Sequence, residues 1–155
     1  MSTTRIKDYL DSEHIEYTTV EHAPAYSAQE VAAAARIPGR QLAKTVMIKV
    51  DGEMAMAVVL ATHRINLERL KDTIGAEQVE LATEKEFRDR FPDCEPGATP
   101  PFGNLYGMQV FADTHLSKNA VISFCGGSHT LLIRMAYADF ERLVGPRLID
   151  FAFEW

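Results

Sequence analysis

The segment Pro96-Gly97-Ala98-Thr99-Pro100-Pro101-Phe102-Gly103 constrains this chain more than any other stretch. Its three prolines and two glycines exclude both a helix interior and a central strand, because proline fixes φ and lacks a backbone donor, while glycine admits positive φ. We predict a rigid, sharply bent loop whose remaining N–H groups point in fixed directions. Such groups can hold a carbonyl, a hydroxyl or a water without a catalytic side chain. A plain connector is the alternative interpretation.

Lys44 is the second unusual feature, because it opens the apolar segment Leu42–Val50. Side chains alternate between the faces of a strand, so Lys44 shares its face with the most apolar residues of the segment, among them Ile48. An ammonium on an apolar face is costly unless a polar group meets it. We therefore predict a polar site at Lys44, with snorkelling of the ammonium to water as the alternative. Lys49 falls on the opposite face, where we expect it to be solvated.

Turn and capping signals divide the rest of the chain into interleaved helices and strands. Asp51-Gly52 is a strong type I′ hairpin signal, and Ser27 with Glu30 has the spacing of a capping box. This order lacks the regular period of a doubly wound fold and predicts a mixed α/β domain with a mixed sheet. We expect helices over residues 4–11, 28–37, 67–74, 84–91 and 137–144, and strands over residues 16–20, 42–50, 53–61, 78–81, 108–112, 120–125 and 130–135.

Composition is that of one ordinary domain spanning residues 1–155, with 46% hydrophobic and 25% charged residues. We see no membrane-spanning run and no signal-peptide core, and we expect a cytoplasmic protein. The net charge of −6 argues against tight, non-specific nucleic-acid binding. Residues 31–50 nevertheless contain four basic residues and no acid. This basic edge is suited to contact phosphates, and an ordinary solvated turn is the alternative.

Patterns for metal or nucleophilic catalysis are missing from the sequence. The histidines lack zinc-type spacing, and we expect neither a metal nor an organic cofactor. Gly126-Gly127-Ser128-His129 is not the nucleophile elbow of a serine hydrolase. Cys94 and Cys125 are far apart in sequence, which favours reduced thiols. We interpret Cys125 as a core residue, and the acids around Cys94 raise rather than lower a thiol pKa.

Taken together, these motifs resemble the YbaK/prolyl-tRNA-synthetase-associated domain family. Lys44 opens an apolar strand, the Asp51-Gly52 hairpin follows, and Gly97–Pro101 comes about fifty residues later. The resemblance spans nearly the whole chain, and it also takes in Glu21-His22-Ala23-Pro24, Ser27-Ala28-Gln29-Glu30, Gly126-Gly127 and the helical segment Asp139-Phe140-Glu141-Arg142-Leu143. Free-standing members of the family are aminoacyl-tRNA deacylases that clear mischarged tRNA in trans.

This resemblance implies a curled, barrel-like mixed β-sheet surrounded by helices. It also implies a catalytic centre formed by Lys44, Gly97, Ala98, Thr99, Pro100 and Pro101. The substrate-binding residues that we expect beside this centre are His22, Tyr26, Gly103, Cys125, Gly126, Gly127, Ser128 and His129. N–H groups around Gly97 would stabilise the ester carbonyl, and Lys44 would clamp a phosphate or ribose or hold the loop. We favour positioning over general-base work for Lys44, because nothing in the sequence lowers its pKa enough.

The predicted function is hydrolysis of a small amino acid mischarged onto tRNA, with tRNA(Pro) as the favoured substrate. The partner is then the acceptor end of tRNA, and a role for a synthetase is left open. Cys125 and Ser128-His129 depart from better-known relatives, so the identity of the amino acid also stays open. One alternative is a non-catalytic module of the same fold that binds tRNA ends or a synthetase. Another is a hydrolase of a different small ester or thioester.

Overall fold

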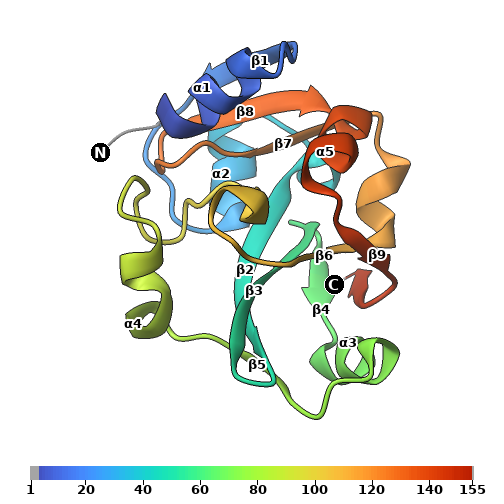
Figure 1. The fold of residues 1–155 in the computed structure, drawn as a ribbon. Helices are drawn as coiled ribbons and strands as arrows, with labels where there is room; N and C mark the ends of the chain where they lie inside the picture. The colour runs from blue at the N-terminus through green and yellow to red at the C-terminus, as the bar shows by residue number, and fades with distance from the viewer. Residues whose placement is uncertain (1–3, 155) are drawn as a thin grey trace.

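The structure is a computed structural model that describes residues 4–154, in which helices and strands alternate along the chain (Figure 1). Short 3-10 turns connect several of these elements. The helices are α1 (Thr4–Ser12), α2 (Ala28–Ala35), α3 (Leu67–Ile74), α4 (Glu84–Phe87) and α5 (Tyr137–Val144). The strands are β1 (Tyr17–Glu21), β2 (Ala43–Val50), β3 (Glu53–Leu60), β4 (His63–Ile65), β5 (Val79–Leu81), β6 (Val110–Asp113), β7 (Val121–Cys125), β8 (Leu131–Ala136), β9 (Arg147–Ile149) and β10 (Ala152–Glu154).

The strands form three sheets, and the largest is mixed as expected. Its order is β5-β2-β3-β6-β9, with β6 parallel to both of its neighbours and the other pairs antiparallel. The second sheet, β1-β8-β7, is antiparallel, and the third is the pair β10-β4. A single bridge from Leu42 to Ser123 links the two larger sheets. The mixed α/β class is confirmed, whereas a closed or curled barrel is not found among the described strands.

The β2–β3 hairpin runs down the middle of the molecule (Figure 1). Its turn residues Asp51 and Gly52 have φ values of 49° and 86°, which is the pattern of a type I′ turn and confirms the prediction. The turn fixes the register, so that Val50 pairs with Glu53 and Lys44 pairs with Val59. The position of Lys44 at the far end of the hairpin therefore follows from the turn.

Helix boundaries follow their capping residues. The Ser27–Glu30 capping box is present at α2, and Asn66 caps α3. Helix α2 ends at Ala35, earlier than predicted, because Arg36 adopts a left-handed conformation and its N–H bonds back to Ala32 and Ala33. Helix α4 is also shorter than predicted, since a 3-10 turn over Arg88–Arg90 replaces its second half.

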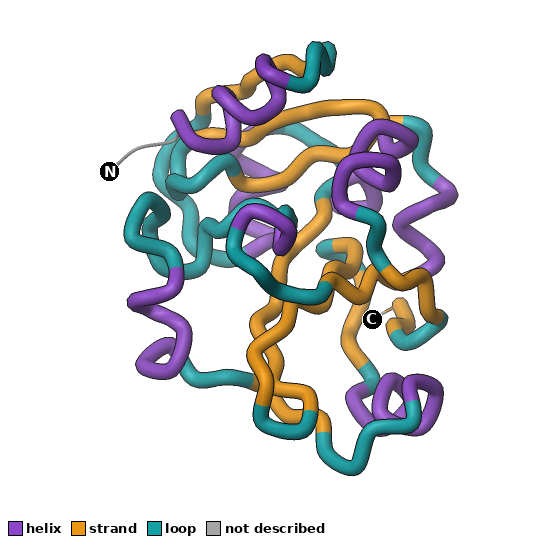
Figure 2. The backbone as a smooth tube through the Cα atoms, viewed as in Figure 1, coloured by secondary structure: helices purple, strands orange, loops and turns teal. Residues whose placement is uncertain are grey.

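The proline-rich loop is anchored in the main hydrophobic core through Phe102. This side chain is fully buried, and its ring lies 6.0 Å from that of Tyr9, 5.4 Å from Phe124 and 5.6 Å from Phe140. These contacts join α1, β7 and α5 to the loop, which Figure 2 draws as irregular backbone. A separate apolar cluster under α2 includes Val31, Leu42 and Leu132. Packing of Phe102 in the core therefore fixes the position of the loop, which a plain connector would not require.

The C-terminal segment contains structure that the sequence did not predict. Strands β9 and β10 are three residues each, and β10 pairs with β4, which was also missed. Three-residue strands leave too little alternation to be recognised in a sequence. No helix within residues 4–154 is long and apolar enough to cross a membrane.

Candidate functional site

A pocket lies where four segments meet: the start of α2, the start of β2, the proline-rich loop and the end of β7 with the turn behind it. Its cavity is about 60 Å³. The pocket is lined by Tyr26, Ser27, Ala28, Val31, Leu42, Ala43, Lys44, Thr45, Gly97, Thr99, Cys125 and His129. The fold thus brings Lys44 to the loop, although fifty residues separate them in sequence.

Lys44 lies near the start of β2, at one end of the row of apolar residues on its face of the strand. Ile48 on the same face is fully buried in the second core cluster, whereas Lys44 is half-buried and lines the pocket. Burial lowers the pKa of the Lys44 ammonium. The sequence alone did not indicate this lowering, which removes one reason for excluding Lys44 as a general base. Lys49 is not simply solvated, since it is half-buried and pairs with Glu80 and Glu86.

The proline-rich loop contributes two residues to the pocket lining, Gly97 and Thr99. Gly97 has a φ of 86°, in the left-handed region that favours glycine. Within residues 4–154, no acceptor receives the N–H of Gly97 or of Thr99. The Ala98 N–H is already used, because it donates to the Glu95 carbonyl at 3.0 Å. Among the loop residues that line the pocket, Gly97 and Thr99 therefore keep the free N–H groups that we expected.

The turn after β7 holds the loop in place. Glu95 N–H donates to the Gly127 carbonyl at 2.8 Å, and Gly127 N–H donates to the Ala98 carbonyl at 3.0 Å. The His129 N–H donates to the Glu95 carboxylate at 2.6 Å, and its Nε2 lies 2.7 Å from the Pro96 carbonyl. This last contact is a hydrogen bond when Nε2 carries the proton. His129 therefore orients the loop that presents Gly97.

Tyr26 forms part of the rim of the pocket. Its side chain is 73% exposed, which is unusual for an aromatic residue, and its ring lies 4.8 Å from the His129 ring. The adjacent Ser27 begins α2 through its capping box, so the rim is fixed by the helix start. Sequence reasoning interpreted Ser27 only as a cap and missed Ala28, Val31, Leu42, Ala43 and Thr45 as lining residues.

Several of the predicted site residues lie outside the pocket lining, although they support it. A Cβ at Gly103 would lie 2.6 Å from both the Met108 carbonyl oxygen and Val110 Cγ2, so Gly103 is required by packing. Ser128 bonds to Thr130 rather than to the pocket. His22 donates its N–H to the Thr130 carbonyl. The other predicted residues outside the lining are buried beneath it, namely Ala98, Pro100, Pro101, Gly126 and Gly127.

Neither cysteine has the environment of a nucleophile. Cys125 lines the pocket, and burial raises the pKa of its thiol to about 11. Cys94 lies in the main core, where burial also raises its pKa, with nearby Asp93 adding to the effect. Both thiols are therefore protonated near neutral pH, and Cys125 acts as an apolar wall of the pocket.

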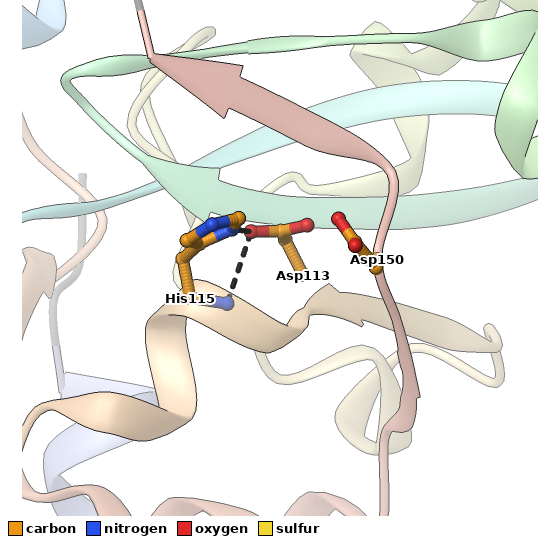
Figure 3. A group of neighbouring side chains, drawn as sticks. All are labelled: Asp113, His115 and Asp150. Carbon is orange, nitrogen blue, oxygen red and sulfur yellow. Dashed lines mark hydrogen bonds and ion pairs between the residues drawn. The ribbon is translucent and has the colours of Figure 1, made fainter.

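A possible metal-binding group lies at another place, where Asp113, His115 and Asp150 come together (Figure 3). Asp113 is fully buried, and one of its oxygens accepts the N–H groups of Phe151 and Ala152 at 2.9 Å each. Its other oxygen accepts the His115 N–H at 3.1 Å and lies 2.6 Å from His115 Nδ1. Both oxygens of Asp113 are engaged in these contacts. Asp113 is therefore better suited to link the 3-10 turn Thr114–Lys118 to the C-terminal segment than to act as a metal ligand.

Comparison with known proteins places these features in a family. The family model described as the aminoacyl-tRNA editing domain matches residues 22–143. The chain is 36% identical over 101 residues to a proline–tRNA ligase of Staphylococcus epidermidis and 35% identical over 97 residues to one of Nitratidesulfovibrio vulgaris. These matches cover 65% and 62% of this chain, but only 18% and 17% of the two ligases.

A solved structure of a protein proposed to be a trans-editing enzyme for prolyl-tRNA synthetase has the same fold. It aligns with a TM-score of 0.81 at 20% identity, covering 97% of this chain and 96% of the other. The family match includes Lys44, the proline-rich loop and the turn around Gly127, which are the segments that build the pocket. The resemblance found in the sequence is thereby confirmed, and the chain belongs to the aminoacyl-tRNA editing domain family.

Proposed function

We propose that this protein is an aminoacyl-tRNA deacylase that acts in trans on a small amino acid mischarged onto tRNA, with residues 1–155 as the editing unit. The observation that carries the proposal is the small pocket in which Lys44 faces a loop with two unengaged N–H groups, those of Gly97 and Thr99. The matched region of proline–tRNA ligases supports tRNA(Pro) as the substrate.

The proposed chemistry needs little from the side chains. A water attacks the ester carbonyl carbon, the bond from carbonyl carbon to ribose oxygen breaks, and the ribose oxygen takes a proton as the free amino acid leaves. The N–H groups of Gly97 and Thr99 would stabilise the negative charge on the carbonyl oxygen in the tetrahedral intermediate. The neighbouring ribose hydroxyl can assist the proton transfer. Lys44 would donate to a ribose or phosphate oxygen and so hold the ester against the loop.

Selectivity would come from the size of the pocket. A cavity of about 60 Å³ walled by Val31, Leu42 and Cys125 would accept a methyl, hydroxymethyl or mercaptomethyl group more readily than an aromatic ring. Discrimination by one methylene is weak, about 1–3 kcal/mol, so closely related small amino acids would compete. The proposal therefore specifies a size class rather than one amino acid.

The test is a panel of labelled aminoacyl-tRNAs, including tRNA(Pro) charged with alanine, cysteine or serine, in which loss of label is followed. We expect selective hydrolysis of a small amino acid by the native chain and its loss in Lys44→Ala. Lys49→Ala is the matched control, since this lysine lies on the same strand outside the pocket. Normal activity of a folded Lys44→Ala variant, or its failure to fold, would reject the assigned role of Lys44.

The net charge of −6 favours a second candidate, a non-catalytic module that binds tRNA ends or docks on a synthetase. Under that candidate the protein would bind aminoacyl-tRNA, with or without a synthetase, and release it unhydrolysed in a single-turnover assay. Hydrolysis of a small ester that free tRNA fails to inhibit would instead indicate a different substrate class.

A further inference from the structure

A second, wider groove of about 480 Å³ lies close to the pocket. It is bounded by the 3-10 turn Gly39–Gln41, the end of β3, β4 and the 3-10 turn Thr114–Lys118. Its size lies within the range of ordinary ligand sites, about 300–1,000 Å³. The polar residues that line it are Arg40, Thr62, His63, His115, Lys118, Asn119 and Glu154, and we call it the basic groove.

The lining of the basic groove holds two cations, Arg40 and Lys118, against the single carboxylate of Glu154. The His115 imidazole lies 2.6 Å from the buried Asp113 carboxylate, with Asp150 beside both, so the basic character of the groove rests on the two cations alone. Within residues 4–154, no carboxylate forms an ion pair with Arg40 or Lys118. Unpaired cations that converge on one groove are suited to bind an anion.

The groove is held open by contacts that fix its two edges. The Asn119 side-chain amide donates to the Arg40 carbonyl at 2.9 Å, which ties the turn that carries Lys118 to the turn that carries Arg40. A Cβ at Gly39 would lie 3.0 Å from Thr62 Cγ2, so the first turn approaches the β3–β4 connection closely. The spacing between the two turns that carry the cations is therefore set before a ligand binds, which lowers the entropic cost of binding.

The basic groove is also close to the pocket through the chain itself. Arg40 and Lys44 are four residues apart, so their Cα atoms are separated by at most about 14 Å. The pKa of His63 is lowered chiefly by burial and then by His115, and Lys44 makes a smaller contribution in the same direction. A stacked strand that rises about 3.4 Å per nucleotide would cross this interval in about four nucleotides.

We propose that the basic groove binds a phosphate of the tRNA 3′ strand, within about four nucleotides of the ester held in the pocket. This inference rests on the proposed deacylase function, and it assigns Arg40 and Lys118 as positioning residues outside the reacting centre. A free phosphate or a small phosphorylated ligand would use the same chemistry, and the test separates these sources.

The test compares the double variant Arg40→Glu/Lys118→Glu with the native chain on two substrates. One is the tRNA that the native chain hydrolyses, and the other is the same amino acid esterified to adenosine alone. Lys85→Glu/Arg88→Glu is the charge-matched control, because both residues are exposed and α4 lies on the opposite side of Figure 1 from residues 114–118. Circular dichroism and urea unfolding check the fold, and Arg40→Gln/Lys118→Gln provides a milder replacement.

On tRNA we expect the double variant to lose at least tenfold in kcat/KM at low salt, with a slope of log(kcat/KM) against log[salt] that is shallower by about 0.7, the value for one single-strand phosphate contact. On the adenosine ester we expect native kcat/KM, because that ligand does not reach the groove. The control should match the native chain on both substrates. Unchanged activity on tRNA, or an equal loss on both substrates, would overturn the proposal.

Failure of the deacylase function can be distinguished from failure of this inference. If the native chain hydrolyses neither substrate, binding of an uncharged acceptor-stem RNA is measured by fluorescence anisotropy. Weaker binding to the double variant than to the control would still support the groove, and equal binding would reject it. Inorganic phosphate that displaces the RNA only at millimolar concentration supports the nucleic-acid source. Tight phosphate binding without any RNA binding would overturn it.

Discussion

Alanine at Gly103 should destabilise the protein more than alanine at Gly97, although both glycines lie on the proline-rich loop. A Cβ at Gly97 meets only His129 Cε1, at 3.5 Å, so the substitution costs backbone strain alone. For a φ of 86° this strain is about 1–2 kcal/mol. A Cβ at Gly103 meets the Met108 carbonyl oxygen and Val110 Cγ2 at 2.6 Å. Since backbone cannot move aside easily, we expect about 3 kcal/mol or more there.

These costs correspond to different melting temperatures and different effects on activity. For a chain of this length, 1 kcal/mol lowers Tm by about 2–4 °C, so we expect a loss of about 2–8 °C in Gly97→Ala and at least 6 °C in Gly103→Ala. Gly97→Ala should also lower kcat, because strain at Gly97 redirects an N–H group that lines the pocket. Gly103→Ala should keep the native kcat per folded molecule.

The assay is thermal and urea unfolding followed by circular dichroism, together with deacylation rates corrected for the folded fraction. The reasoning about packing would be refuted if Gly103→Ala were the more stable of the two variants. The reasoning about the site would be refuted if Gly97→Ala kept full activity, or if well-folded Gly103→Ala lost it.

Three further predictions follow from the buried polar groups. Lys44→Met should be at least as stable as the native chain at pH 7, because burial lowers the lysine pKa and so disfavours its charged form. The stability advantage of the variant should shrink as the pH rises from the lowered pKa of the folded state toward the pKa of an unfolded lysine, and urea unfolding at several pH values would show this. Cys125 should react with iodoacetamide at pH 8 about a hundredfold more slowly than a free thiol, because a pKa of about 11 leaves about 0.1% thiolate. Mass spectrometry measures the labelling rate, and a rate close to that of a free thiol would contradict this prediction. Asp113→Asn should lower the free energy of unfolding by about 3 kcal/mol, since an amide cannot accept all the N–H groups that this carboxylate receives. A loss below about 1 kcal/mol in urea unfolding would contradict the structural role of Asp113.

The parts of the fold that the sequence predicts well are those set by local physics. Asp51-Gly52 determines its turn through backbone conformations that few residues adopt, and the Ser27–Glu30 capping box determines where α2 begins. The elements that were missed depend on distant contacts. Strand β4 exists because it pairs with β10, and the C-terminal segment is held by Asp113, whose partners lie almost forty residues away. No local pattern reports such contacts.

The candidate site was predictable to a similar extent. Alternation along β2 marked Lys44 as anomalous, and the composition of residues 96–103 marked the loop, but only the family resemblance connected the two. Sequence reasoning also took the whole loop as a source of donors, whereas Ala98 uses its N–H within the loop and Gly103 is required for packing. Which N–H groups stay free depends on the turn around Gly127, and that turn has no signature in the loop itself.

Both proposals depend on one short segment, residues 39–45, and this gives the two sites a common mechanical basis. Arg40 lies on its 3-10 turn and Lys44 on the strand that follows. Leu42 between them is buried, its carbonyl accepts the Ala61 N–H at 2.8 Å, and its N–H bonds to Gly39 at 3.2 Å. Because these contacts prevent the segment from sliding along β3, a phosphate bound at Arg40 would hold a fixed distance from the ester at Lys44. Under both proposals, backbone pairing would align the pocket with the RNA, and a loss of that pairing would displace Leu42 and Lys44 and so impair hydrolysis of both the tRNA and the adenosine ester.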